Sequence, residues 1–395
     1  MEVVFDRQQL SEALGAASAI ASLVGRENKL LQNFVKLFVR PDRSYLWATS
    51  VIHSIRIAVP TVEVVRPGVA LLPIGEVGAI VRENPDERLK LEVSGSILHI
   101  SGQNTYQFPF PDPDEYPNPP GLEKGAGVGD DSGGDLEGLA AAEVPAVPET
   151  THETNARLLS ELIRRTCYAA DVESSRYALG GVFFEFHPNR LVAVATDARR
   201  LAKMEVPCEA VAADAEQVKT ALVPSKALEV LQRVLATYDG PIRIGTGERN
   251  VAFTSDKFEV ALMQLEGRFP KWREVLERLQ PGQALELVAG SFLAAVRQAA
   301  IVCTAESKGL SFNLSEGELR IQATSEAGAT SHVRMPVSYS GPNVEVTLDA
   351  KFVTDFLRLL DPMAVVTFEV VSRDSPTVFR TSDEYLYLVM PMSRR

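Results

Sequence analysis

The sequence contains few of the residues that disulfide-rich and metal-binding proteins need. Only three of its 395 residues are cysteines, and Cys167, Cys208 and Cys303 are far apart. An odd and widely spaced set predicts buried thiols in a reducing compartment rather than disulfides or a metal site. The five histidines are also dispersed, and no HExxH or Cys/His metal spacing occurs. We therefore expect neither a metal nor another cofactor.

Signals for membranes, secretion and catalysis are also missing. No uninterrupted apolar run approaches the length of a membrane-spanning helix. The first residues, MEVVFDRQQL, have neither a basic region nor an apolar region of a secretory signal. No Walker A loop and no nucleophile elbow is present. We expect a cytoplasmic protein that has no catalytic site and no membrane partner.

Acidic residues are concentrated in one segment. The whole chain has a net charge of −12, and residues 121–153 hold eight acids against one lysine, a net −7. The other residues together carry only −5, so the overall charge does not exclude a nucleic-acid partner. Residues 121–153 are rich in Gly, Ala and Pro and lack apolar periodicity, which predicts a flexible linker.

A long internal repeat is the most informative positive feature. Three similar strings close three copies, at Thr105–Pro117, Glu259–Pro270 and Glu384–Met392. Pro270 and Pro391 are 121 residues apart. A unit of this length can bury its own core, so the repeat predicts one domain used three times rather than a solenoid. We place the domains at 1–120, 154–280 and 281–395, with the acidic linker at 121–153.

Each copy has the same order of predicted elements. An amphipathic helix comes first, at Arg7–Ile20, Ala156–Ala169 and Ser291–Cys303. Three alternating strands, a second helix and at least three further strands follow. The second helices lie within residues 71–84, 222–236 and 347–361, where Pro73, Pro224 and Asp349 suit helix starts. This order predicts an α+β fold with two helices per domain packed on antiparallel sheets.

Four motifs resemble one family, the bacterial sliding clamp, which is the beta subunit of DNA polymerase III. They are ATDARRLA at Ala195–Ala202, LVPSKALEVL at Leu222–Leu231, LEGRFPKWREVL at Leu265–Leu276 and YLYLVMPM at Tyr385–Met392. The resemblance implies three repeated clamp domains that dimerise head to tail into a ring. Its helices would line the hole around double-stranded DNA, and the protein would tether the replicative polymerase during processive synthesis.

The resemblance and the helix positions together suggest residues that contact DNA. A ring needs a positive inner surface and no base readout. The predicted DNA-binding residues are Arg26, Arg164, Arg165, Arg176, Tyr177, Lys226 and Arg297.

The resemblance also implies an apolar groove for short linear peptides from the polymerase, the clamp loader and repair factors. Adaptable methionines and a rim of arginine suit several related peptides with acidic or amide ends. The matching residues are Leu179, Thr196, Ala198, Arg199, Arg200, Leu201, Pro270, Val275, Leu388, Val389, Met390, Pro391 and Met392. A plain core strand is the alternative interpretation of Tyr385–Met392.

The dimer contact implied by the resemblance pairs a first-domain edge strand with the third domain. The matching residues are Tyr106 and Phe108, opposite Ile301 and Val302. Two other functions stay open at this point. One is a clamp paralogue that serves repair or a mobile element, and the other is a metal-dependent hydrolase that uses clustered acids such as those in Pro111–Glu115.

Overall fold

The computed structural model describes residues 1–119, 147–172, 177–212 and 217–392. Its contacts divide the chain into two compact units. The first unit contains residues 1–157 and 209–264, and the second contains residues 158–208 and 265–395. The predicted central domain therefore contributes to both units, and the three predicted domain boundaries remain a proposal.

The first unit is built from two antiparallel sheets and the helices that cover them. Its helices are α1 (Arg7–Ala21), α2 (Lys29–Asn33), α3 (Ile74–Glu83) and α5 (Ser225–Leu235), with a 3-10 turn at Pro113–Glu115. One sheet has the order β5-β1-β7-β8-β9: Thr61–Arg66, Glu2–Asp6, Arg88–Ser94, Ile97–Ser101 and Thr105–Pro109. The other has the order β14-β10-β16-β17-β18-β4-β3-β2-β6: Glu209–Ala210, Thr150–Asn155, Pro241–Thr246, Asn250–Thr254, Phe258–Met263, Ser54–Ala58, Tyr45–Thr49, Phe34–Val39 and Gly68–Pro73. Strand β15 (Lys219–Pro224) leads directly into α5.

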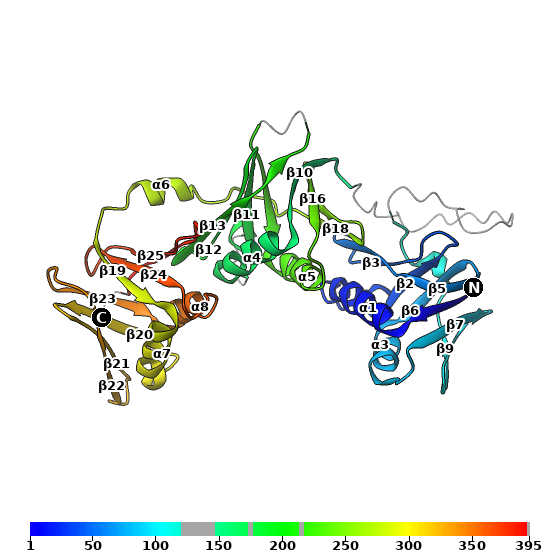
Figure 1. Ribbon diagram of the computed structural model, residues 1–395, viewed down its shortest axis with the longest axis horizontal. Helices are drawn as coiled ribbons and strands as arrows, with labels where there is room; N and C mark the ends of the chain where they lie inside the picture. The colour runs from blue at the N-terminus through cyan, green and yellow to red at the C-terminus, as the bar shows by residue number, and fades with distance from the viewer. Residues whose placement is uncertain (120–146, 173–176, 213–216, 393–395) are drawn as a thin grey trace. The chain divides into compact units, whose positions relative to one another are not determined.

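Helix α1 shows how the sequence pattern becomes packing in this unit. The Asp6 carboxylate accepts a hydrogen bond from Gln9 N and so caps the helix. Leu10, Leu14 and Ala17, which are three or four residues apart, are fully or nearly fully buried. This face packs against α3, α5 and strands β3 and β4, and Figure 1 shows α1 and α3 beside their sheets. Burial of one such leucine contributes about 1.5 to 3 kcal/mol.

The second unit repeats the combination of helices and antiparallel sheets. Its helices are α4 (Ala156–Thr166), α6 (Trp272–Glu277), α7 (Ala289–Ala299) and α8 (Ala350–Leu357), with 3-10 turns at Cys167–Ala169, Tyr177–Leu179 and Ala300–Val302. The first two residues of α4 belong to the first unit. One sheet runs β11-β12-β13-β26-β25-β24-β19: Gly181–His187, Arg190–Thr196, Arg200–Pro207, Leu386–Val389, Thr377–Arg380, Val365–Val370 and Gln283–Val288. The other is β22-β21-β20-β23: Thr330–Pro336, Glu318–Thr324, Gly309–Ser315 and Val344–Asp349. Helices α7 and α8 pack side by side (Figure 1).

The predicted helices and the α+β class are confirmed, and the short elements between them were missed. Helices α1, α3, α4, α5, α7 and α8 lie within the six predicted segments or extend beyond them by at most two residues. Strand β10 was not predicted, because its sequence TTHETN is polar throughout. Its residues Thr151 and His152 are nevertheless buried, since tertiary packing overrides strand propensity.

Strand β10 also corrects the predicted linker. Thr150–Asn155 pairs with β16, so the last four residues of the 121–153 segment belong to a sheet. The linker prediction was wrong for those residues. Residues 120–146 lie outside the described part of the chain, so the prediction for residues 121–146 is untested.

A buried lysine holds the segment that follows β9. Lys36 is 2% exposed, and its ammonium donates to Pro113 O at 2.6 Å, Tyr116 O at 3.2 Å and Asn118 Oδ1 at 2.7 Å. Trp47 Nε1 donates to a carbonyl of the same segment, at 3.0 Å. The acidic string at residues 111–115 is therefore part of a turn that a buried cation fixes in place.

Candidate functional site

The C-terminal strand β26 joins two predicted domains in one sheet. It pairs antiparallel with β13, with Leu201 opposite Leu388. On its other side β26 pairs with β25. A continuous sheet therefore connects residues 181–207 to residues 365–389 inside the second unit. Two of the four recognised motifs meet at this β13–β26 junction.

Backbone hydrogen bonds extend the junction beyond the end of β26. Met390 N donates to Arg199 O at 2.8 Å, and Met392 N donates to Thr347 O at 2.8 Å. The last described residues thus run from the β12–β13 turn to strand β23. Met390, with 42% of its surface exposed, lies on this path. Because these two hydrogen bonds hold the extended segment, Met390 has a defined position in the protein without a ligand.

The thirteen predicted groove residues fall into two classes, and all belong to the second unit. Those that are buried are Leu179, Thr196, Arg200, Leu201, Leu388 and Val389. Those that are exposed or half-buried are Ala198, Arg199, Pro270, Val275, Met390, Pro391 and Met392. The buried six support the site from within. The other seven carry the surface that a ligand can reach.

Arg200 is the clearest example of a predicted groove residue whose side chain points inward. It is 7% exposed, and its guanidinium donates to Asp197 at 2.9 Å, to Asp355 at 3.1 Å and to Tyr168 O at 2.7 Å. Its Cζ also lies 4.4 Å from the centre of the Phe352 ring. These contacts link β13 to α8, so Arg200 positions the site rather than lining it.

Three tyrosines adjoin Arg200: Tyr385 and Tyr387 are buried, and Tyr168 is half-buried. The hydroxyls of Tyr168 and Tyr385 are 2.8 Å apart, and Tyr387 Oη donates to Phe352 O at 3.1 Å. Burial raises the pKa of all three phenols above its ordinary value, so they stay neutral at physiological pH. The group therefore provides hydrogen bonds and aromatic packing at the β13–β26 junction without adding charge.

The turn between β12 and β13 directs Arg199 outward. Asp197 Oδ1 accepts hydrogen bonds from Arg199 N and Arg200 N, both at 2.9 Å. Ala198, which lies between Asp197 and Arg199, has φ +69°, a left-handed conformation that costs a residue with a Cβ about 1 kcal/mol. The motif around Ala198 is therefore held in a strained turn. The result is that Arg199 is exposed and Arg200, its neighbour, is buried.

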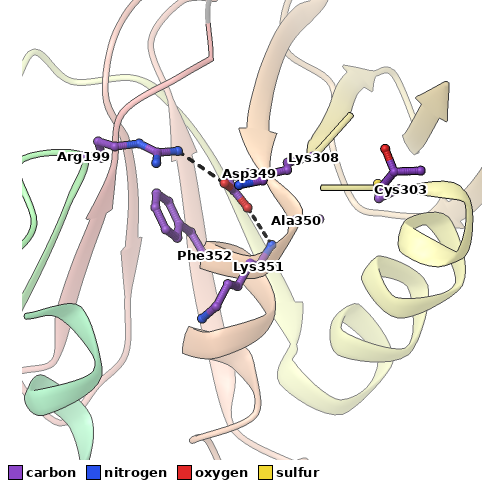
Figure 2. A pocket seen from close by; sticks show the side chains of 8 residues that line it. Arg199, Cys303, Lys308, Asp349, Ala350, Lys351 and Phe352 are labelled. Atoms are coloured by element: carbon purple, nitrogen blue, oxygen red, sulfur yellow. Dashed lines mark hydrogen bonds and ion pairs between the residues drawn. The ribbon is translucent and has the colours of Figure 1, made fainter. Parts of the chain in front are cut away.

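A hollow of about 380 Å³ lies beside Arg199. Its lining includes Arg199, Cys303, Lys308, Asp349, Lys351 and Phe352. Figure 2 shows the Arg199 guanidinium extending toward the Asp349 carboxylate, with the Phe352 ring close by. Sequence reasoning assigned Asp349 only to a helix start and left Lys308 and Phe352 unassigned. The motif at Ala195–Ala202 and the helix start at Asp349 were the available signals, and neither indicates that Lys308 lies beside them.

Two carboxylate interactions fix the wall of this hollow. Asp349 is 4% exposed. Its Oδ1 accepts a hydrogen bond from Lys351 N at 2.9 Å, which caps α8, and its Oδ2 forms an ion pair with Arg199 at 3.3 Å.

Burial, together with the nearby Asp349 charge, raises the pKa of the Cys303 thiol. Cys303 is therefore a neutral thiol near pH 7 and a weak nucleophile there.

Two of the predicted DNA-binding arginines have partners within the protein. Arg165 pairs with Glu161 at 2.5 Å and with Asp383 at 2.6 Å, and its side chain is 11% exposed. Arg164 pairs with Glu161 at 2.6 Å and donates to Leu359 O at 2.8 Å. These contacts attach α4 to residues near β26 and α8. DNA contact by Arg164 and Arg165 remains a prediction, and it would have to compete with these interactions.

The other predicted DNA-binding residues differ in exposure and in how much the structure describes. Arg26, between α1 and α2, and Lys226 and Arg297, on α5 and α7, are exposed. In the described parts of the chain these three side chains form no ion pair. Arg176 lies outside the described residues, as does the side chain of Tyr177.

The predicted dimer residues lie where an interface can use them. Tyr106 and Phe108 are half-buried on β9, the edge strand of its sheet. Ile301 is 79% exposed, and Val302 beside it is half-buried in a 3-10 turn. An unpaired strand edge and an exposed isoleucine are both features that association would cover.

Searches for other kinds of site cover only the described residues. Within them, no group of three or more His, Cys, Asp or Glu side chains is arranged to hold a metal ion. No helix in the same residues has the length and hydropathy needed to cross a membrane.

Comparisons with known proteins agree on one fold. The DNA polymerase III beta subunit of Thermotoga maritima superposes with a TM-score of 0.84 at 21% identity, and the match covers 100% of both chains. A sliding clamp of Pseudomonas aeruginosa bound to griselimycin gives 0.85 at 22% identity, again over 100% of both chains. The chain therefore has the fold that these sliding-clamp structures share.

Sequence comparisons point to the same group. Residues 153–271 match the family described as DNA polymerase III beta subunit, central domain. The beta sliding clamp of Pseudomonas aeruginosa is 29% identical over 265 residues, which are 65% of this chain and 70% of that protein. The Escherichia coli beta sliding clamp is also 29% identical, over 262 residues with the same coverage. The predicted resemblance to the bacterial DNA polymerase III beta subunit family is confirmed.

Proposed function

We propose that this protein is a DNA sliding clamp that acts in bacterial replication. The observation that carries the proposal is a fold shared over its full length with sliding clamps, together with 29% identity to curated beta sliding clamps. In this role the protein works as a processivity factor and needs no catalytic residues. Its place of action is the cytoplasm, on the nucleoid.

The physical basis of the proposal is topological binding. Two copies would close head to tail around double-stranded DNA through β9 of one copy and the Ile301 turn of the other. Exposed cations such as Lys226 and Arg297 would meet phosphates without reading sequence. Dissociation would then require an interface to open, so the protein would slide and still remain bound.

Loading on circular DNA tests encirclement. The protein is assembled with its clamp loader and ATP on nicked circular duplex DNA, and the DNA is then cut once. We expect retention on the circle through gel filtration and release after linearisation. Equal retention on linear and circular DNA would contradict encirclement. A paralogue that serves repair would load in the same way, and stimulation of the replicative polymerase separates the two roles.

Peptide binding is the second part of the proposal. The groove formed by Met390, Pro391, Met392 and the exposed predicted residues of the β12–β13 turn and α6 would hold the client segments. The exposed Met390 side chain is unbranched and flexible, which suits several related ligands. The Met390→Ala, Met392→Ala variant should lose polymerase stimulation and keep loading on circular DNA. Unchanged stimulation would remove the groove assignment.

A further inference from the structure

We infer that Glu185 is a positioning residue of the peptide groove, because its buried carboxylate holds helix α6, one wall of the groove, through Arg273. The inference rests on the peptide binding proposed above, and it concerns the construction of the groove rather than its ligand. Glu185 lies on β11, and Arg273 is the second residue of α6. Val275, the predicted groove residue on α6, is the side chain that this ion pair would place.

Helix α6 has little stability of its own. It contains six residues, and in the described chain its N-cap residue Lys271 makes no side-chain hydrogen bond to the first turn. An isolated helix shorter than about 12 residues is at best marginally stable in water. The ion pairs of Glu274 with Lys271 and Arg278 are exposed and contribute little. The position of α6 therefore depends on its contacts with the rest of the second unit.

A bidentate ion pair joins α6 to the sheet. Arg273 Nη1 donates to Glu185 Oε1, and Arg273 Nη2 donates to Glu185 Oε2, both at 2.5 Å. The Glu185 side chain is 6% exposed, whereas that of Arg273 is 51% exposed. Burial acts to raise the pKa of Glu185, but the hydrogen bonds from Arg273 and from His187 hold it below its ordinary value. The carboxylate therefore stays charged at neutral pH and keeps its partner.

Aromatic packing attaches the segment before α6 to the same strand. Phe269 stacks on Phe183 of β11, with the ring centres 5.0 Å apart. Trp272 is buried, and the Arg273 guanidinium carbon lies 4.2 Å from the centre of its ring. Phe269 comes directly before Pro270, the other predicted groove residue of this segment. The stacking and the ion pair therefore anchor the segment at two points on β11.

Strand register places both anchors on the groove's face of the sheet. Directly paired residues of antiparallel strands share a face, and so do alternate residues of one strand. One row of paired residues on this face is Phe183, Val194, Lys203 and Leu386. The next row, two residues along each strand, contains three predicted groove residues, Thr196, Leu201 and Leu388. Glu185 lies on the same face and is covered, so its influence on a ligand must pass through α6.

Fluorescence anisotropy of a labelled hexapeptide with a Leu and a Phe anchor tests the inference. Glu185→Gln keeps the size of the side chain and removes its charge. The variant should bind the peptide roughly three- to tenfold more weakly, equivalent to losing part of one apolar contact, and should still load on circular DNA. Arg273→Gln changes a half-exposed side chain and should give the same loss.

Glu318→Gln is the matched control. Glu318 is also a carboxylate with two arginine contacts, from Arg320 and Arg334, and all three residues lie on β21 and β22. Removing its charge should leave the affinity for the peptide unchanged.

Two further measurements separate a positioning role from a general loss of stability. In a Trp47→Phe background, emission from Trp272 reports on α6, and Glu185→Gln should increase its quenching by acrylamide without denaturant. In a Val275→Ala background, Glu185→Gln should weaken peptide binding by less than about twofold, because the side chain that it positions is already truncated. A general loss of stability would not depend on Val275.

The possible failures are distinguishable. If Glu185→Gln and Arg273→Gln both bind the peptide as tightly as the wild type, the positioning role is overturned and the groove stands. If Glu185→Gln weakens binding equally with and without Val275→Ala, its effect does not pass through α6, and the assignment is overturned. If no peptide binds to wild-type protein that still loads on circular DNA, the groove and its positioning residue both fail, and the clamp function is unaffected.

Discussion

Replacing Arg200 with methionine should destabilise the second unit strongly. The substitution keeps a similar length and apolar stem, and it removes a guanidinium with three hydrogen bonds at 2.7 to 3.1 Å. Asp197 and the Tyr168 carbonyl would lose a buried donor, and Asp355 would lose its partner on β13. Removing one member of a buried ion pair typically costs about 3 to 5 kcal/mol. Because Arg200 is 7% exposed, solvent screening reduces this value little.

Urea unfolding followed by tryptophan fluorescence measures this loss. The chain has two tryptophans, Trp47 in the first unit and Trp272 in the second. A Trp47→Phe background therefore makes the emission report on the second unit alone. Arg334→Met is the matched control, since Arg334 is 70% exposed and lies 3.9 Å from its nearest acid. It should change the free energy of unfolding by less than about 0.5 kcal/mol.

A double-mutant cycle tests the stated cause. Combining Arg200→Met with Asp355→Asn should cost less than the sum of the two single changes, with a coupling of about 1 kcal/mol or more. If Arg200→Met costs less than about 1 kcal/mol, the argument from buried charge is refuted. If the loss is large but additive with Asp355→Asn, the ion pair is not its source.

Three further predictions concern a buried lysine, a buried histidine and the exposed cations. Lys36→Met should lower the free energy of unfolding of the first unit by about 2 to 4 kcal/mol, because three acceptors lose their donor. The same change should make residues 110–119 more accessible to proteolysis, and cleavage at the wild-type rate would contradict this. Burial lowers the pKa of His53 to about 4, and its Nδ1 accepts a hydrogen bond from Met263 N. The contribution of the neutral His53 ring to the free energy of unfolding should therefore be fully present above pH 6.5 and fall by up to about 3 kcal/mol toward pH 4. His53→Gln should flatten that dependence of the urea midpoint on pH, and an unchanged slope would assign it to other groups. Arg297→Gln should weaken retention on circular DNA as salt rises and leave stability unchanged, whereas Arg165→Gln should lower the urea midpoint of the second unit.

Local pattern explains which parts of the fold could be predicted. Helix α1 follows from the spacing of Leu10, Leu14 and Ala17, and α8 follows from the cap at Asp349. The polar strand β10 shows the limit, since nothing in its own sequence indicates burial. Its position is set by pairing with β16, about 90 residues away in the chain.

The candidate site was predictable as a region and not as a set of contacts. The motifs around Arg199 and Met390 identified two segments that the structure brings together through β13 and β26. The motif alone did not distinguish Arg199 from Arg200, because both residues have the same chemistry. The strained turn at Ala198 decides that one is exposed and the other buried. The position of Lys308 in the lining of the hollow was not predicted, because it depends on residues from other segments of the chain.

The sequence by itself determined the repeat, the six amphipathic helices and the resemblance to sliding clamps, since periodicity and motifs are written in consecutive residues. Only the tertiary structure decided which charges are available. Arg200 and Asp355 are 155 residues apart and meet in the interior, and Arg165 meets Asp383 across 218 residues. Arg297, of the same residue type, stays exposed. The physical reason is that burial and ion pairing depend on contacts distant in sequence, whereas helix and strand patterns depend on neighbours.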